Sequence, residues 1–162
     1  MNIPVRYLPK NLTRKDRARQ RRELKRSRAA YKKGEYITRR RVKSFRSKKS
    51  EHIARAEKMY SLKNFKLDKT LANRTRCKLS GLKQIMKKGQ GAYYSSGSRP
   101  NQTAHSWGYA RLASSVTGGK ASAVDNHILE EYCDKNSRAL KLSRRAIKRF
   151  NHGTRRVPKV KL

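Results

Sequence analysis

The chain has 162 residues, of which 45 are Lys or Arg and 10 are Asp or Glu, and its net charge is +35. Hydrophobic residues make up 35% of the chain, less than in most globular domains, and no apolar run approaches the length of a membrane span. This composition excludes a membrane-spanning protein and indicates a soluble or peripheral one. Because such a charge repels itself, the chain needs an anionic partner: nucleic acid, a membrane surface or acidic protein neighbours.

The positive charge is distributed unevenly along the sequence. Residues 1–88 contain 31 Lys or Arg against 6 Asp or Glu, and residues 138–162 contain 10 against none. The intervening residues 89–137 contain four of each and hold the only Trp, Trp107. A neutral block rich in small residues between two cationic regions predicts a packed unit that works in an anionic or crowded setting.

Residues 1–66 are expected to form a basic N-terminal arm. The two prolines of MNIPVRYLPKNL predict an extended start over residues 1–12, because proline blocks helix formation and restricts the residue before it. Thr13, followed three residues later by Asp16, then predicts the start of a long helix. Gly34 is expected to end that helix.

Few apolar side chains are available on this long basic helix, namely Leu24, Ala30 and Tyr31. Like charges four residues apart repel each other on a solvated helix, so the helix is expected to form fully only against an anionic or protein surface. Residues 35–46 are expected to be extended, and a short helix is expected over residues 51–61.

Residues 67–151 are predicted to form a small, mainly α-helical core domain, followed by a basic extended tail over residues 152–162. Helical spacing of apolar residues predicts the helices, and Gly and Ser predict the breaks between them. The expected order is a helix over 68–79, a break at Ser80-Gly81, a short helix ending at Gly89, a loop over 89–102, a helix from Thr103 to Gly118-Gly119, and helices over 120–133 and 137–151. A domain of this size buries only about 60–65% of its unfolded surface, which favours stabilisation by partners.

The basic residues of the arm and tail are candidate contacts to a polyanion or to a protein partner. If these residues bind phosphates, the binding is expected to weaken steeply as the salt concentration rises. The alternative is that they contact acidic surfaces of neighbouring proteins. The aromatic residues among them are limited to Tyr31, Tyr36 and Phe45, which argues against recognition by base stacking. The candidate residues are Arg14, Lys15, Arg17, Arg19, Arg21, Arg22, Lys25, Arg26, Arg28, Arg39, Arg40, Arg41, Lys43, Arg46, Lys48, Lys49, Arg155 and Arg156.

The stretch YYSSGSRPNQT, residues 93–103, is chemically the most distinctive. Its hydroxyl groups, its arginine and the helix start that follows form a candidate anion-binding loop. The alternative, which we favour, is a polar loop whose side chains cap the helix and bond to their own backbone. The loop candidates are Ser95, Ser96, Ser98 and Arg99, and the expected core or interface anchors are Tyr93, Tyr94, Trp107, Tyr109 and Leu112.

No catalytic, cofactor or metal motif accompanies these features. His127 and Glu131 share a helix face, but no third ligand or HExxH pattern lies near them. Cys77 and Cys133 have no CxxC partner, so they are expected to be separate thiols, as in proteins of a reducing compartment such as the cytosol or nucleus. The N-terminus lacks the apolar region of a signal peptide. We therefore expect a protein that is neither secreted nor an enzyme, and that holds no cofactor and no metal.

A resemblance to known proteins covers most of the chain. It is carried by RYLPKNLTRKDRARQ (6–20), KSFRSKKSEHIARA (43–56) and AYYSSGSRPNQTAHSWGYARLASSVTGGKASAVDNHILEEYC (92–133). These stretches resemble an uncharacterised family of small basic proteins encoded by large icosahedral DNA viruses of algae and related hosts. The resemblance implies a viral origin and carries over no catalytic or binding residue.

For a virus of that type, the resemblance implies a minor capsid or other virion protein, placed between the major capsid shell and an inner membrane around the genome. We expect a structural protein that cements or links the major and other minor capsid proteins, in a virion assembled in the host cytoplasm. Both the genome and the inner membrane surface are anionic and are further candidate partners. The alternative is a nucleic-acid-binding protein, either genome-condensing or a ribosomal-type RNA binder. An enzyme acting on a phosphorylated substrate through residues 95–99 has the least support.

Overall fold

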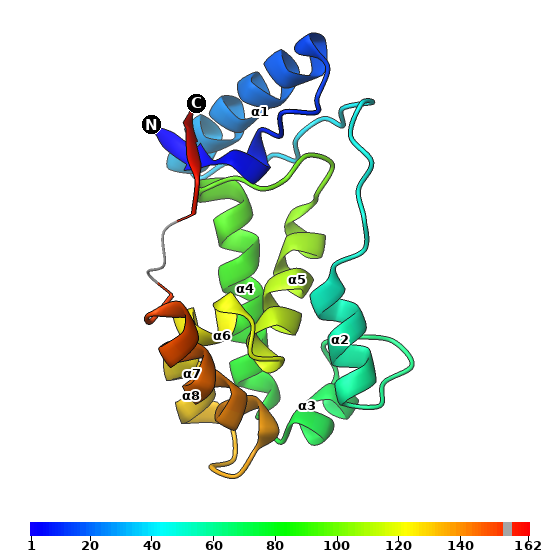
Figure 1. The fold of residues 1–162 in the computed structure, drawn as a ribbon, viewed down its shortest axis with the longest axis vertical. Helices are drawn as coiled ribbons and strands as arrows, with labels where there is room; N and C mark the ends of the chain where they lie inside the picture. The colour runs from blue at the N-terminus through cyan, green and yellow to red at the C-terminus, as the bar shows by residue number, and fades with distance from the viewer. Residues whose placement is uncertain (154–156) are drawn as a thin grey trace. The chain divides into compact units, whose positions relative to one another are not determined.

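A computed structural model describes residues 1–153 and 157–162 of the chain, and over these residues the protein is mainly α-helical (Figure 1). This confirms the fold class predicted from the sequence. The elements in chain order are β1 (Asn2–Pro4), the 3-10 turn η1 (Val5–Tyr7), α1 (Arg14–Lys32), α2 (Glu51–Met59), α3 (Lys69–Thr75), α4 (Leu79–Ser95), α5 (Ala104–Val116), α6 (Lys120–Val124), α7 (Asn126–Tyr132), α8 (Arg138–Phe150) and β2 (Lys159–Lys161). In the described part of the chain, no helix combines the length and apolar character needed to cross a membrane.

The chain divides into two compact units. Unit 1 comprises residues 1–48 and 90–107 together with the C-terminal residues 157–162. Unit 2 comprises residues 49–89 and 108–153. The helices α4 and α5 each contribute residues to both units, so the division does not follow the order of the sequence.

Local capping signals predicted several helix ends correctly. The Thr13 side chain accepts a hydrogen bond from the Asp16 N–H at the start of α1, and the chain leaves this helix through Gly34 at φ +81°. The helix α8 begins where expected, because Ser137 caps it by accepting from the Leu140 N–H at 3.2 Å. Such signals lie within four residues of one another and need no tertiary information.

The expected break at Ser80-Gly81 and the expected loop from Gly89 are wrong, because α4 continues through both positions to Ser95. Gly81 packs against Tyr132, where a side chain would collide with that ring. A Cβ atom added to Gly89 would lie 2.7 Å from the Cα of Gly108 in α5. These glycines serve the close approach of neighbouring elements rather than the end of a helix.

The helix expected over 120–133 is also divided, into α6 and α7, with the chain turning at Asp125. The other expected helices lie close to their predicted ranges, although α2 and α3 each end earlier than expected. Residues 35–46, which were predicted to be extended, form neither helix nor strand in the described chain, and the chain turns at Lys43-Ser44.

Unit 1 is built around the two ends of the chain. β1 and β2 pair in antiparallel fashion, with Ile3 opposite Val160, so the N- and C-termini lie side by side (Figure 1). Both ends were predicted to be extended, but their pairing was not predicted. The apolar cluster of this unit consists of Ile3, Tyr7, Leu8, Leu12, Leu24 and Val42, with Phe45, Trp107, Val160 and Leu162 packed against it.

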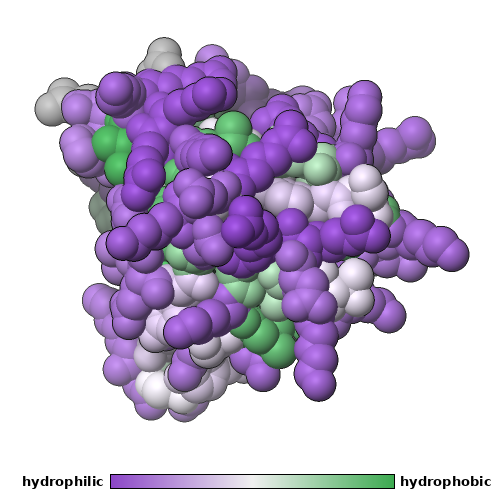
Figure 2. All heavy atoms as spheres, turned by 90° about the horizontal axis from the view of Figure 1, so that it is seen from below, coloured by the Kyte–Doolittle hydropathy of each residue, from purple (hydrophilic) through white to green (hydrophobic). Residues whose placement is uncertain are grey.

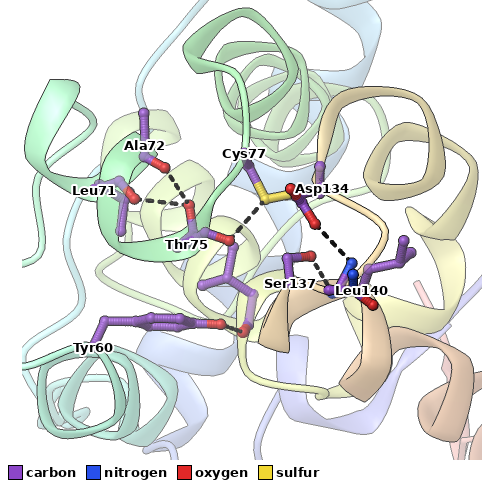
Figure 3. The surroundings of a disulfide bond; sticks show 11 residues. Tyr60, Leu71, Ala72, Thr75, Cys77, Asp134, Ser137 and Leu140 are labelled. Atoms are coloured by element: carbon purple, nitrogen blue, oxygen red, sulfur yellow. Dashed lines mark hydrogen bonds between the residues drawn. A yellow bond between two sulfur atoms is a disulfide. The ribbon is translucent and has the colours of Figure 1, made fainter.

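Unit 2 has a larger apolar core and a covalent cross-link. Its buried side chains include Tyr60, Leu71, Leu82, Ile85, Leu112, Val116, Leu129 and Leu140. The expectation of two separate thiols is wrong: Cys77 and Cys133 face each other in an isolated antiparallel bridge and form a disulfide (Figure 3). The pairing joins residues separated by 56 positions, which sequence spacing alone could not indicate.

Long hydrophilic side chains dominate the molecular face drawn in Figure 2, and hydrophobic surface is visible only in separate patches between them. This distribution agrees with the high content of Lys and Arg.

Candidate polyanion interface

The polar residues of helix α1 are divided between a buried face and an exposed face. Its buried face consists of Asp16, Gln20, Glu23, Leu24, Ser27 and Ala30. These residues recur at intervals of three and four, which places them on one side of the helix. Polar groups therefore complete the inward face that the few apolar residues of this helix could not fill alone.

The buried carboxylates of α1 accept hydrogen bonds from the backbone of the segment that follows. The Asp16 Oδ2 accepts from the Ser44 N–H at 2.7 Å, and the Glu23 Oε2 accepts from the Arg40 N–H at 2.9 Å. The bonds from Ser44 hold the pKa of Asp16 below its ordinary value. Gln20 adds a bond from its Nε2 to the Tyr7 carbonyl at 3.0 Å.

Residues 1–48 contain 19 Lys or Arg against three acidic residues, Asp16, Glu23 and Glu35. Because Asp16 and Glu23 are directed inward, only Glu35 remains on the surface of this stretch. Across the described chain, the only ion pair formed by a cation of residues 1–48 is that of Arg26 with Glu23, at 3.0 Å. The outer surface of this stretch therefore carries a large uncompensated positive charge.

Most of the predicted contact residues lie on that outer surface. The exposed ones in unit 1 are Arg14, Lys15, Arg21, Arg22, Lys25, Arg26, Arg40, Arg41, Lys43, Arg46 and Lys48, and Arg17, Arg19 and Arg28 are half-buried. Lys32 and Lys33, which the sequence prediction omitted, are also exposed at the end of α1. Arg14, Arg21, Lys25 and Lys32 form one row, because their spacing repeats close to whole helical turns over about 27 Å.

Two of the predicted residues do not belong to this surface, and two others lie outside the described residues. Arg39 is buried. Lys49 belongs to unit 2, where its Nζ lies 3.2 Å from the carboxylate of Glu57. The last two, Arg155 and Arg156, lie outside the described residues. Arg17, although half-exposed, is engaged in holding the N-terminal segment, since its guanidinium donates to the Pro9 carbonyl at 2.9 Å.

The buried Arg39 side chain links separate segments of unit 1 through hydrogen bonds. Its guanidinium donates to the Ser27 hydroxyl at 3.1 Å, to the Tyr93 carbonyl at 2.9 Å and to the Ser98 hydroxyl at 2.5 Å. It also lies over the Tyr93 ring, 3.7 Å from the centroid, in a cation–π contact. Burial lowers the pKa of Arg39. The group joins three segments that are distant in the sequence.

The candidate anion loop is held by a hydrogen bond to its own backbone and by bonds to residues 39–45. Ser98 is fully buried, accepts from Arg39 and donates to the Arg99 carbonyl at 2.8 Å. Ser96 and Arg99 are exposed, whereas the Ser98 hydroxyl is directed inward, so the four candidate side chains do not share one surface. The Ser95 and Ser96 hydroxyls lie 3.4 Å apart. This arrangement matches the alternative of a self-bonded polar loop.

The expected anchor residues occupy different environments. Tyr93 is fully buried in unit 1 and Leu112 in unit 2. Trp107 packs edge-on against Tyr7, with ring centroids 5.8 Å apart. Tyr109 packs against Phe65 and accepts from the Leu67 N–H at 3.2 Å.

Tyr94 lies in a cluster that the sequence did not reveal, because it joins two distant segments. Its ring is parallel to that of Tyr31, with centroids 6.2 Å apart, and Tyr36 packs edge-on against both rings. The expectation that aromatic residues are sparse in the basic region considered only neighbours in the sequence. The fold adds Tyr93 and Tyr94 to Tyr31 and Tyr36.

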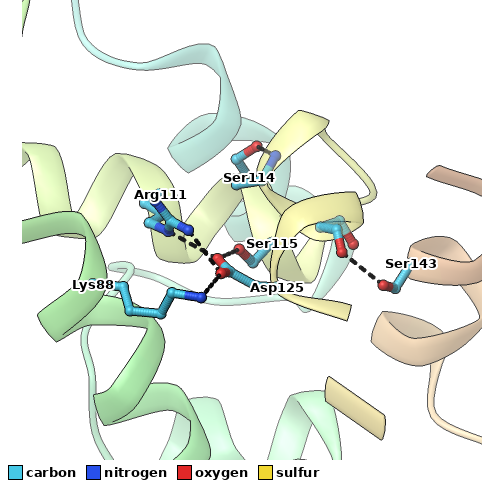
Figure 4. Close-up of polar contacts among 8 residues, drawn as sticks. Lys88, Arg111, Ser114, Ser115, Asp125 and Ser143 are labelled. Atoms are coloured by element: carbon cyan, nitrogen blue, oxygen red, sulfur yellow. Dashed lines mark hydrogen bonds and ion pairs between the residues drawn. The ribbon is translucent and has the colours of Figure 1, made fainter. Parts of the chain in front are cut away.

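Unit 2 contains a buried carboxylate that binds two cations. Asp125 is fully buried and accepts two hydrogen bonds from the Arg111 guanidinium at 2.7 and 2.9 Å, and its carboxylate lies 3.0 Å from the Lys88 Nζ (Figure 4). The Ser115 hydroxyl donates to it at 3.0 Å. Burial raises the pKa of Asp125, but the bonds and charges of Arg111 and Lys88 outweigh burial and hold it below its ordinary value. This cluster fastens α4 and α5 to the turn between α6 and α7.

The described residues include no group of three or more His, Cys, Asp or Glu side chains placed to hold a metal ion. The exposed pair His127 and Glu131 on α7 is therefore not extended by a third ligand within this part of the chain.

Comparison with known proteins gives a family but no function. No curated protein and no solved structure matches the chain. The family of unknown function DUF5824 matches residues 4–152, which includes all eight helices given above. The chain belongs to this family.

Proposed function

We propose that this protein is a non-enzymatic structural protein that binds the phosphate backbone of nucleic acid through the outward face of α1 and the exposed cations of residues 40–48. The observation that supports this most is the separation of charge in unit 1. The carboxylates of α1 are directed inward to backbone N–H groups, and among the cations of this helix only Arg26, which lies 3.0 Å from Glu23, forms an ion pair in the described chain.

The length and regularity of the cationic surface fit a repeating polyanion. A row of four cations along about 27 Å of helix can meet several successive phosphates. The flanking segment adds Arg40, Arg41, Lys43, Arg46 and Lys48. Contacts of this kind fix position on the backbone without reading the sequence of bases.

The proposal is tested by measuring the binding of a fluorescent random-sequence DNA of about 20 base pairs as salt is raised. Each neutralised phosphate contributes a slope of about −0.9 to a plot of log K against log salt concentration, so a slope of about −4 or steeper is expected, equally for unrelated sequences. Absence of binding at low salt, or a slope close to zero, would overturn the proposal.

A second candidate function is that of a minor capsid protein, in which the same surface would make contacts inside a virus particle. The resemblance to virus-encoded basic proteins favours a minor capsid protein that cements or links capsid proteins and meets the genome or an inner membrane. Mass spectrometry of purified particles, divided into shell and nucleoprotein fractions after nuclease and high-salt washing, separates the two candidates. Retention in the shell at fixed stoichiometry supports the capsid role, and release with nucleic acid supports backbone binding alone.

A further inference from the structure

We propose that Tyr36, supported by Tyr31, Tyr94 and the buried Tyr93, is a platform on which a base of single-stranded nucleic acid stacks. This inference rests on the proposed binding of nucleic acid and specifies the form that is bound. It follows from the presence, in unit 1, of an exposed ring in an aromatic cluster together with exposed cations that form no ion pair in the described chain.

The cluster combines two parts of the chain, the end of α1 with the segment that follows it and the end of α4. The buried Tyr93 supports the other rings. Tyr31 lies in the last turn of α1, Tyr36 follows that helix, and the other two tyrosines lie in the last turn of α4. Tyr93 packs edge-on against Tyr94, with ring centroids 5.0 Å apart, and its own ring is covered by Arg39. Tyr93 Oη accepts from the Arg39 N–H at 3.0 Å. The base of the cluster is therefore rigid.

The outer part of the cluster is accessible. Tyr36 is 67% exposed, the highest value among the large hydrophobic side chains of the described residues. Its ring centroid lies 5.9 Å from that of Tyr31 and 5.2 Å from that of Tyr94, in edge-on geometry. A rigidly supported ring that remains open to solvent loses little conformational entropy when a flat ligand stacks on it.

Exposed cations flank Tyr31 and Tyr36 in the sequence. Lys32 and Lys33 follow Tyr31 directly, Arg28 lies one helical turn before it, and Arg40 lies four residues after Tyr36. All four are at least partly exposed, and none forms an ion pair in the described chain. Glu35 is the acidic residue that lies between Lys33 and Tyr36 in the sequence, and the buried Glu23 carboxylate accepts from the Arg40 N–H at 2.9 Å. Phosphates of a strand that stacks on Tyr36 would therefore have exposed cations available from both neighbouring parts of the sequence.

This combination favours single strands over duplexes. Proteins that bind single strands without sequence preference pair a cationic groove with aromatic rings on which successive bases stack. In a duplex the base faces are already covered by their neighbours, so the rings gain nothing from it. Duplex binding would then depend on the cations alone.

The test compares the full-length protein with the variants Tyr36→Leu and Tyr36→Phe. The probes are a fluorescent single-stranded oligodeoxythymidylate, an abasic strand of the same length and charge, and a duplex. Tyr36→Leu is expected to weaken binding of the single strand about tenfold and to leave binding of the abasic strand and the duplex unchanged. Tyr36→Phe, which keeps the ring, is expected to bind like the wild type. Because Tyr36 is exposed, both variants are expected to keep the wild-type melting temperature.

The outcomes separate this inference from the proposed function. If Tyr36→Leu binds the single strand as tightly as the wild type, or loses affinity equally for all three probes, the stacking platform is overturned while backbone binding stands. If the wild type binds none of the probes at low salt, the proposed function fails, and the platform fails with it.

Discussion

The two units of this protein stabilise themselves by different means. Unit 2 has a large apolar core, a disulfide and one buried carboxylate held by two cations. Unit 1 has a smaller apolar cluster and depends on buried polar groups: Asp16, Gln20, Glu23 and Arg39. Each of these groups is paired with a backbone or side-chain partner, as burial of a polar group requires.

The difference explains how a chain with a net charge of +35 forms a compact unit in its most basic part. Carboxylates that are buried can accept hydrogen bonds from backbone N–H groups, and the exposed surface of the same helix then carries mainly cations. Stability and the proposed binding of nucleic acid therefore depend mainly on different residues of the same helix. We therefore expect that substitutions can change the free energy of unfolding without changing the binding of nucleic acid, and the reverse.

The largest effect is expected from removal of the disulfide of unit 2. The double variant Cys77→Ala with Cys133→Ala is expected to lower the free energy of unfolding by about 4 kcal/mol, because the unfolded chain is no longer restricted by a loop of 56 residues. Urea denaturation measures the change. Wild type treated with a reducing agent should lose a similar amount, and equal stability of the oxidised, reduced and substituted proteins would show that the bond does not stabilise unit 2.

The next effect is expected in unit 1, at Arg39. Arg39→Met keeps most of the side-chain length but leaves the Ser27 hydroxyl, the Tyr93 carbonyl and the Ser98 hydroxyl without their donor. We expect a loss of about 3 kcal/mol in urea denaturation. Arg40→Met is the matched control, because the Arg40 side chain is exposed and only its backbone N–H is used. Similar losses for the two variants would contradict the structural role of Arg39.

A smaller effect is expected from Asp125→Asn in unit 2, which keeps the shape of the side chain but removes the charge that holds Arg111 and Lys88. At neutral pH we expect a loss of about 2 kcal/mol. Because the pKa of Asp125 is lowered in the folded protein, its contribution is present above the unfolded pKa and is lost as pH falls through the folded one.

Denaturation of the wild type and Asp125→Asn at a series of pH values tests this directly. The difference between them should be constant from pH 7 to about pH 5 and should shrink below about pH 4, where the unfolded carboxylate begins to bind protons. A difference that stays the same down to about pH 2 would contradict the role of the charge.

The sequence predicted features that depend on near neighbours and missed those that depend on distant ones. The helix starts at Thr13 and near residue 137 were correctly expected, and at both positions a side-chain cap acts within one turn. Gly89 was read as a helix end, whereas its role is set by Gly108 on another helix. The disulfide and the pairing of β1 with β2 likewise join residues far apart in the chain.

In the candidate site, too, the features that depend on residues far apart in the sequence were not predicted. Most cations of α1 are on the surface as expected, but the burial of Arg39 depends on Ser27, Tyr93 and Ser98, which belong to separate segments. The tyrosine cluster also combines two such segments. No periodic pattern in one segment contains this information.

The central claim is that the outward face of α1 binds nucleic acid, and it is tested by neutralising matched pairs of cations. The variant Arg21→Gln with Lys25→Gln removes two exposed charges one turn apart on α1, and Lys141→Gln with Arg145→Gln does the same on α8 in unit 2. Both should keep the wild-type melting temperature. For a random-sequence duplex, the α1 variant should reduce the magnitude of the salt slope by about 1.8, and the α8 variant should leave it unchanged. Equal slopes for the wild type and the α1 variant, or an equal loss in both variants, would contradict the account.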